Sequence, residues 1–197
     1  MQKQILSLFA ARTGHFRFES GHHGDLWLDV PLAFIEPVKI RPYARELAGR
    51  LSAHRAEVVC GPLVEGAFLA QMVAEELGVG FCFAEQFARS TADGLFPVGY
   101  RIPGAVRPRI AGKRVAVVDD VINAGSAVRG ATDQLKSCGA RPVAIGALLT
   151  LGARASSLAA AEKVSLETLS TLELSNLWDP ASCPLCAAGE PLENERL

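Results

Sequence analysis

The chain has 197 residues, of which 49% are apolar, and a formal net charge of −1 at pH 7. This length suits one well-buried domain and is short for two. Without excess charge or a run of like charge, the chain offers no general attraction to nucleic acid or to an anionic membrane, so neither is expected as a partner. Any anion that the protein binds must be held by a local site.

The hydrophobic segments predict a protein outside the membrane. Runs such as Val115 to Val118 have the length of a strand, far below the ~20 residues that span a bilayer, and the N-terminal residues MQKQILSLFAARTG carry apolar side chains at helical spacing. Cys60, Cys82 and Cys138 lie in apolar or helical stretches, where free thiols are common in a reducing compartment. We therefore expect a soluble, cytoplasmic protein.

The N-terminal residues predict an appendage, here termed the hood (residues 1–35). A helix is expected near Gln2 to Ala11, and extended segments are expected at Phe16 to Phe18 and Leu26 to Val30. A further helix, from Pro37 or Arg41 to Ala53, begins the core (residues 36–175).

From about residue 57, short β-rich runs alternate with amphipathic helical stretches, which is typical of an α/β fold with a mainly parallel central sheet flanked by helices. The whole chain is expected to form one domain, with the hood, the core and a C-terminal tail (residues 176–197). The expected strands are Glu57–Cys60, Gly80–Phe87, Lys113–Asp119, Pro142–Thr150 and Val164–Ser170, and the expected helices are Val64–Leu77, Ser126–Ser137 and Ala153–Lys163.

One long excursion interrupts this alternation at residues 88–112. It is rich in Gly, Pro and Arg and has no sustained helical period. We therefore expect a long, partly extended segment, and long loops inside compact domains are usually either functional or disordered.

The segment VAVVDDVINAGSAVRG predicts the functional site. A β-favouring run delivers Asp119 and Asp120 to the C-terminal end of a strand, which is the edge where open α/β sheets bind ligands. A tight turn, residues 123–125, and a helix with Ser126 as N-cap candidate follow, so backbone N–H groups and a hydroxyl converge at a positive helix end. Such a turn suits a phosphate.

Carboxylates beside a phosphate-binding turn require an explanation, because they would repel the bound phosphate. A ribose phosphate provides one: its 2- and 3-hydroxyls can donate to Asp119 and Asp120, directly or through Mg²⁺, while its 5-phosphate lies in the turn. Two alternatives are an Asp-capped turn without a ligand, and a receiver domain, although a receiver domain would carry its acidic pair near the start of the chain.

The segment resembles the motif of type I phosphoribosyltransferases that binds phosphoribosyl pyrophosphate (PRPP), and its VVDDVINAGSA form most resembles orotate phosphoribosyltransferases. The resemblance implies a Mg²⁺-dependent homodimer that transfers ribose-5-phosphate from PRPP to a nitrogenous base, orotate first among the candidates. It also implies that Asp119 and Asp120 hold the ribose hydroxyls. The 5-phosphate would then be held by Asn123, Ala124, Gly125, Ser126 and Ala127.

Two other segments extend this resemblance. VVCGPLVEGAFLA is similar to the family's pyrophosphate loop, which implies roles for Gly61, Pro62, Glu65 and Gly66, although a basic residue is usual where Glu65 stands and the pattern is common in ordinary strand–turn–helix units. TGHFRFESGHHGDLWLD resembles the base-binding hood. Its matching residues are Phe16, Phe18, Ser20, Gly21, Trp27 and Asp29.

The hood and the excursion also depart from the family. Glu19 replaces a basic residue of the family. His22 and His23 could supply the missing positive or hydrogen-bonding character, and the alternative is that they are exposed loop residues without a role. The excursion stands where the family has a mobile lid; Arg89 matches an arginine at its start and is the catalytic candidate there, but Ser90 replaces a lysine. Arg154 lies a few residues from where orotate enzymes carry a carboxylate-binding arginine, and we expect it to begin a helix.

The tail contains CPLC, and the spacing of Cys183 and Cys186 suits one half of a structural Zn²⁺ site. The remaining ligands would have to come from elsewhere in the fold or from a second subunit, and the alternative is a simple turn with free thiols.

Two other functions remain open. One is a phosphoribosyltransferase for another base, which would account for the altered lid and base-binding residues. The other is a non-catalytic regulatory protein that keeps the PRPP or nucleotide pocket and acts through a protein partner.

Overall fold

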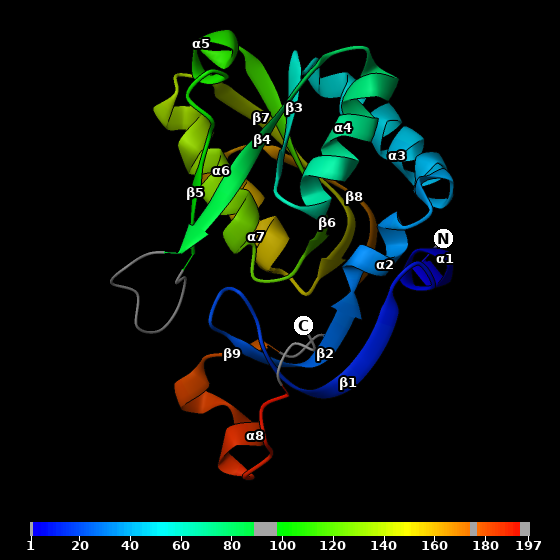
Figure 1. Ribbon diagram of the computed structural model, residues 1–197, viewed down its shortest axis with the longest axis vertical. Coiled ribbons are helices and arrows are strands. Elements are labelled where there is room, and N and C mark those ends of the chain that lie inside the picture. The colour runs from blue at the N-terminus through cyan, green and yellow to red at the C-terminus, as the bar shows by residue number, and fades with distance from the viewer. Residues whose placement is uncertain (1, 89–97, 174–176, 194–197) are drawn as a thin grey trace.

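A computed structural model of the chain describes residues 2–88, 98–173 and 177–193. A large sheet lies between two groups of helices, and a smaller sheet lies below it (Figure 1). The elements are α1 (Gln2–Leu6), β1 (Ala10–Arg17), β2 (His23–Asp29), α2 (Val30–Phe34), α3 (Pro37–Leu51), η1 (Ser52–His54), β3 (Val58–Pro62), α4 (Glu65–Leu77), β4 (Gly80–Ala88), β5 (Val98–Arg101), α5 (Arg107–Ile110), β6 (Arg114–Ile122), α6 (Ser126–Ser137), β7 (Arg141–Leu151), α7 (Arg154–Glu162), β8 (Ser165–Leu172), β9 (Leu177–Trp178), η2 (Pro180–Ser182) and α8 (Pro184–Ala187).

The large sheet has the strand order β5-β4-β3-β6-β7-β8. Its neighbouring strands are parallel except for β4 and β5, which are antiparallel. The predicted α/β class with a mainly parallel sheet is therefore confirmed. From β3 the chain passes through α4 to β4, whereas from β6 it passes through α6 to β7 on the other side, so the connections diverge between β3 and β6.

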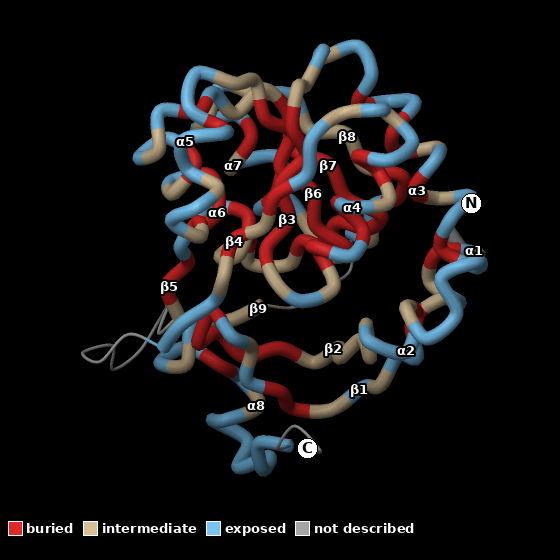
Figure 2. Tube along the Cα trace, turned by 45° about the horizontal axis from the view of Figure 1, so that its top comes forward, coloured by how far each residue is buried: buried red, intermediate tan, exposed pale blue. Residues whose placement is uncertain are grey.

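The sheet separates two apolar cores. On β6, Ala116 and Val118 belong to the core packed under α3 and α4, and Val115 and Val117 belong to the core under α6 and α7. This alternation arises because successive side chains of a strand point to opposite faces. Figure 2 shows the buried central strands between their exposed helical layers. The strand ends that carry the candidate site are thereby fixed on both faces.

The small sheet joins the two ends of the chain. Strands β1 and β2 form an antiparallel hairpin, and β9 from the tail pairs with β2, placing Trp178 opposite His23. The predicted N-terminal helix is wrong beyond Leu6, because the chain turns to bury Phe9 and then runs as β1 from Ala10. Pairing with β2 outweighs the helical spacing of these residues.

The core helices agree with the expectations to within a few residues. Helix α3 begins at Pro37, the earlier of the two expected starts, where the missing N–H of proline costs no helical hydrogen bond. Helix α6 has the expected bounds, and α7 begins at Arg154.

The excursion after β4 contains more regular structure than its composition indicates. Residues 98–101 form β5, which pairs antiparallel with β4, and residues 107–110 form the short helix α5. Arg89 and Ser90 lie outside the described residues. Of the helices described, none combines the length and apolar character that a membrane crossing requires.

Candidate functional site

Strand β6 places Asp119 and Asp120 at the edge of the sheet. Both side chains are buried, with 8% and 7% of their surface exposed, although the strand continues to Ile122 rather than ending at Asp119 as predicted. A backbone N–H donates to each carboxylate: the Asp120 N–H to Asp119 Oδ1 at 3.2 Å and the Val121 N–H to Asp120 Oδ1 at 2.6 Å. None of the ion pairs recorded between described residues includes either acid.

This burial shifts both acids toward their protonated forms. Desolvation, followed by the charge of Asp120, raises the pKa of Asp119 well above its usual value. Desolvation and the nearby Glu65 raise the pKa of Asp120 to about 7. A cation or a set of hydroxyl donors entering the site would favour the ionised forms, since either compensates the buried charge.

The turn after β6 presents a helix N-terminus to the same edge. Gly125, with φ of 77°, caps α6, so the predicted cap, Ser126, is instead the first residue of the helix. A left-handed conformation costs glycine little because it has no Cβ. The first N–H groups of an α-helix have no intrahelical acceptor, so those of α6 are available to an anion beside Ser126.

The loop between β3 and α4 forms the opposite wall. The loop follows β3, the strand next to β6. The helical connections diverge between these two strands, and open α/β sheets bind ligands at such a point. An added Cβ on Gly66 would lie 2.4 Å from Asp119 Oδ1, and one on Gly61 would lie 2.2 Å from the Gly66 carbonyl oxygen. Glycine at both positions therefore allows α4 to approach the acids.

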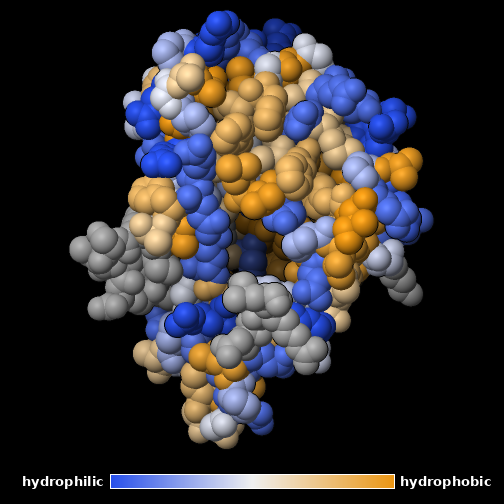
Figure 3. Space-filling model, viewed as in Figure 1, coloured by the Kyte–Doolittle hydropathy of each residue, from blue (hydrophilic) through white to orange (hydrophobic). Residues whose placement is uncertain are grey.

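These segments enclose a cavity of about 330 Å³. In Figure 3 the molecule is hollowed between its larger upper part and the small sheet below. Of the residues predicted for the site, the cavity is lined by Asp119, Asp120, Asn123, Ala124, Gly125, Ser126, Ala127, Pro62, Glu65, Gly66, Phe18 and Ser20. The predicted residues Gly61, Phe16 and Gly21 are buried and do not line the cavity.

An aromatic stack forms the hood wall of the cavity. Phe18 and Trp27 lie parallel with ring centroids 6.1 Å apart, and the buried Phe16 packs against Trp27 at 5.6 Å. The Trp27 Nε1–H donates to Asp29 Oδ1 at 2.8 Å, and Arg12 pairs with the same carboxylate at 3.2 Å. The stack is therefore held in place from behind.

Tyr100 is a cavity residue that the sequence did not indicate. Its hydroxyl donates to Glu19 of the hood, and burial together with this acid raises the pKa of Tyr100. Gly130 makes room for the ring, because a Cβ there would lie 2.3 Å from Tyr100 Cδ2. Within residues 98–112 only Tyr100 lines the cavity, whereas Arg101 pairs with Glu85 at 2.8 Å.

A second contact, between Arg154 and His22, attaches the hood to the core. Arg154 Nη1 lies 3.3 Å from His22 Nε2, and His22 Nδ1 lies 3.1 Å from Ser20 Oγ. Arginine can only donate, so His22 Nε2 accepts and Nδ1 carries the proton that it donates to Ser20. Burial and then Arg154 lower the pKa of His22, which keeps the ring neutral and consistent with this tautomer.

Cys183 and Cys186 lie away from the cavity. They approach His15 on β1 and His23 on β2 beneath the small sheet, and none of these four residues lines the cavity. The predicted cysteine pair thus acquires two histidine neighbours that the sequence did not assign to it.

A model of the phosphoribosyl transferase domain matches residues 28–180 of the chain. The chain is 32% identical to the orotate phosphoribosyltransferase of Thermotoga maritima over 98% of its own length and 96% of that protein. It is 28% identical to the orotate phosphoribosyltransferase of Caldanaerobacter subterraneus over 97% of its own length and 95% of that protein.

The fold is similar to those of solved phosphoribosyltransferases. The orotate phosphoribosyltransferase of Aeropyrum pernix superposes with a TM-score of 0.63 at 22% identity, over 86% of this chain and 95% of that one. The adenine phosphoribosyltransferase of Trypanosoma brucei superposes with a TM-score of 0.67 at 18% identity, over 99% of this chain and 86% of that one.

The raised pKa of Asp120 predicts a pH-dependent stability. Between its ordinary value of 3.8 and about 7, the folded protein retains a proton that the unfolded chain releases, so this group's contribution to the free energy of unfolding falls as pH rises through that window and levels off above it. We expect Asp120→Asn to become more stable relative to wild type between about pH 4 and pH 8.

Urea unfolding of metal-free protein across this range would measure the effect. Asp133→Asn, at an exposed position on α6, is the matched control and should keep a constant offset from wild type. A pH-independent difference between Asp120→Asn and wild type would contradict the assignment.

Proposed function

Since the chain belongs to the phosphoribosyltransferase family, we propose that it transfers ribose-5-phosphate from PRPP to orotate, with release of pyrophosphate and formation of orotidine 5′-phosphate. The observation that carries this proposal is the arrangement of buried Asp119 and Asp120 beside the N-terminus of α6. Both features line one cavity at the switch point of the sheet, where the helical connections diverge between β3 and β6. The similarity to orotate phosphoribosyltransferases, which extends over nearly the whole chain, supports orotate as the base.

PRPP would bind with its ribose between the acids and its 5-phosphate in the turn. The carboxylates of Asp119 and Asp120 are acceptors for the 2- and 3-hydroxyls of the ribose. The N–H groups at the start of α6 and the Ser126 hydroxyl are donors for the phosphate oxygens, at the positive end of the helix dipole.

The acidic lining fits Mg²⁺. Glu19, Glu65, Asp119 and Asp120 all line the cavity, whereas no Lys or Arg does so among the described residues. PRPP itself carries several negative charges, so its binding requires added cations, and oxygen ligands are those that Mg²⁺ prefers. Asp119, Asp120 and Glu65 would hold the ion, which supplies charge neutralisation to the departing pyrophosphate when bound.

The reaction exchanges one bond at C1 of the ribose. The nitrogen of the base bonds to C1 as the C1–O bond to pyrophosphate breaks, and positive charge develops on the sugar ring. Asp119 and Asp120 stabilise that charge through the hydroxyls they hold. The β3–α4 loop, with Pro62 and Gly66, would receive the pyrophosphate, and we propose that Arg89 helps to neutralise it.

The base would lie against the hood. Phe18 and Trp27 offer an aromatic surface for a planar ring. Because His22 donates to Ser20 Oγ, the Ser20 hydroxyl hydrogen is available to the cavity and can donate to an orotate oxygen. Arg154, acting through His22, therefore supports Ser20 as a hydrogen-bond donor.

We also propose a cytoplasmic homodimer. Phe68 on α4 and Phe81 and Phe87 on β4 are exposed to 47%, 38% and 41%, and Figure 3 shows apolar side chains gathered over this part of the molecule. Exposed aromatic surface of this kind is typical of a subunit interface.

A phosphorylated substrate and five free cysteines favour a reducing interior compartment.

An aminopurine is the second candidate base, and Glu19 is the observation that favours it. This carboxylate lines the cavity where it would repel the carboxylate of orotate but accept a hydrogen bond from an exocyclic amine. Tyr100 donates to Glu19 and so reduces its effect on an anionic base.

The double substitution Asp119→Asn with Asp120→Asn should reduce PRPP affinity below detection, because the ribose hydroxyls and the cation lose their charged partners. Isothermal titration of PRPP in the presence of Mg²⁺ would measure the loss, with Asp133→Asn as the matched control and circular dichroism as the check of folding. Unchanged PRPP affinity in the double variant would contradict the ribose assignment.

The acceptor base can be identified by incubating the protein with PRPP, Mg²⁺ and a panel of bases that includes orotate, uracil, adenine and hypoxanthine. We expect pyrophosphate release coupled to orotate consumption. Turnover with a purine alone would refute orotate, and PRPP binding without turnover on any base would refute the enzyme.

The Ser20→Ala substitution should raise KM for orotate roughly tenfold or more with a smaller change in kcat, since it removes a hydrogen bond to a charged group. Steady-state kinetics would separate the two constants, and Ser156→Ala, at an exposed position on α7, is the matched control. An unchanged KM would place the base elsewhere.

A further inference from the structure

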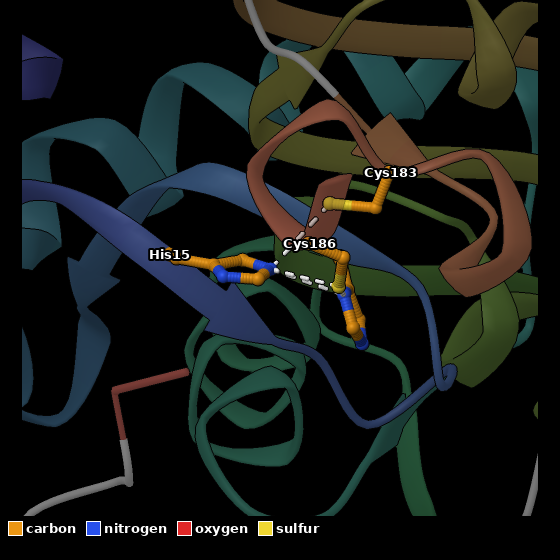
Figure 4. A group of neighbouring side chains, drawn as sticks. His15, Cys183 and Cys186 are labelled. Atoms are coloured by element: carbon orange, nitrogen blue, oxygen red, sulfur yellow. Dashed lines mark hydrogen bonds between the residues drawn. The ribbon is translucent and has the colours of Figure 1, made fainter. Parts of the chain in front are cut away.

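Four side chains with metal-binding atoms meet between the small sheet and the tail. They are His15 on β1, His23 on β2, and Cys183 and Cys186 at the start of α8, and their ligand atoms all lie within 4.8 Å of one another. Figure 4 shows His15 of β1 pointing toward Cys183 and Cys186 of the tail. The cluster thus joins parts of the chain that are far apart in sequence.

Local structure explains how each pair forms. His23 lies opposite Arg17 in the hairpin, and His15 lies in the irregularity of β1 between Thr13 and Phe16, where the pairing with β2 shifts its register. The two imidazole rings meet there, with centroids 5.0 Å apart. Cys183 precedes the single turn of α8 and Cys186 lies within it, three residues later, which places the two thiols on one side. The pairing of β9 with β2 then brings the cysteines to the histidines.

The distances are those of a tetrahedral metal site. His15 Nε2 lies 3.1 Å from His23 Nδ1, 3.4 Å from Cys183 Sγ and 3.7 Å from Cys186 Sγ, and Cys186 Sγ lies 3.2 Å from His23 Nδ1. Zn–N bonds of about 2.0 Å and Zn–S bonds of about 2.3 Å at tetrahedral angles separate N from N by about 3.3 Å and N from S by about 3.5 Å. These four spacings agree with the two values to within about 0.3 Å.

Hydrogen bonding alone does not account for this arrangement. His15 Nδ1 lies 2.8 Å from the Glu190 carbonyl oxygen, which can only accept, so Nδ1 carries the ring proton and Nε2 presents a single lone pair. That lone pair faces three neighbouring atoms at once. A cation at the centre would bind it and would satisfy the other three ligand atoms together, and the Glu190 carbonyl would orient the ring as the outer partners of metal-bound histidines do.

We propose that His15, His23, Cys183 and Cys186 bind a structural Zn²⁺ ion that fastens the tail to the hood. Two thiolates and two imidazoles in a closed tetrahedron are a donor set that favours zinc. His15, His23 and Cys183 are 3%, 5% and 3% exposed, whereas Cys186 is exposed and closes the site on its solvent side. None of the four metal-binding residues lines the cavity with Asp119 and Asp120, so the ion acts on stability and on the placement of the hood.

The surroundings explain why this part of the chain needs such a site. Most of residues 179–193 are exposed, and a small three-stranded sheet buries little apolar surface of its own. Metal binding supplies folding free energy in segments of this kind. Because β2 begins at His23 and the turn before it carries Phe18 and Ser20, the ion also holds the base-binding residues in position.

Metal analysis of the purified full-length protein tests the proposal. We expect one Zn²⁺ per chain in wild type and in the control Cys138→Ser, whose thiol lies outside the cluster, and a loss of roughly a hundredfold or more in zinc affinity in Cys186→Ser and in His15→Ala. Zinc removal should lower the thermal midpoint of wild type. Zinc content that is equal in Cys186→Ser and Cys138→Ser would overturn the assignment.

Cobalt substitution in wild type gives a result that does not depend on how the variants fold. Co²⁺ in this site should show the intense visible bands of tetrahedral coordination and thiolate-to-metal charge transfer in the near ultraviolet. An octahedral spectrum without thiolate bands would overturn the proposal, as would a Cys183–Cys186 disulfide found by mass spectrometry of the freshly purified protein.

Discussion

The burial of Asp119 and Asp120 at the switch point of the sheet is the constraint on which the rest of the site depends. Two adjacent carboxylates, with Glu65 nearby, are removed from water without a recorded ion pair, which costs folding free energy. Strand β6, packed on both faces by apolar cores, holds them there. The consequence is a cavity that accepts a polyanion only together with cations and with N–H donors from α6.

The cavity also depends on a hood that has little core of its own. A three-stranded sheet of this size is marginal alone, and the structure ties it to the rest at separate points. Tyr100 holds Glu19, Arg154 holds His22, and the histidine–cysteine cluster holds the tail strand against β2. These polar attachments compensate for the small apolar area, so the position of Phe18 over the cavity is set by residues from three distant segments.

Sequence reasoning was accurate where the information was local. The β6–α6 segment carries its strand, acids, turn and helix start within consecutive residues, so its placement on the cavity could be inferred. Features that depend on distant pairing were missed: residues 10–12 have helical character but pair with β2, and Tyr100 enters the cavity only because β5 folds back on β4. His15 and His23 on a hairpin, with CPLC downstream, were a possible four-ligand set, but the register irregularity between Thr13 and Phe16 that brings the two rings together is not visible in the sequence.

Glu19 bears most directly on which base the cavity accepts, and the contacts around Glu19 decide how strongly it repels an anionic base. An orotate carboxylate next to an isolated Glu19 would be repelled, but the Tyr100 hydroxyl already donates to that acid and withdraws part of its charge. On the same turn, Arg154 fixes the tautomer of His22, and His22 in turn leaves Ser20 as a donor. Hydrogen-bond donor character therefore reaches the proposed base-binding surface through a relay from α7 rather than from a basic residue within the hood. An anionic base can be accommodated in this way despite the acidic lining, because the donors that face it are oriented before it binds.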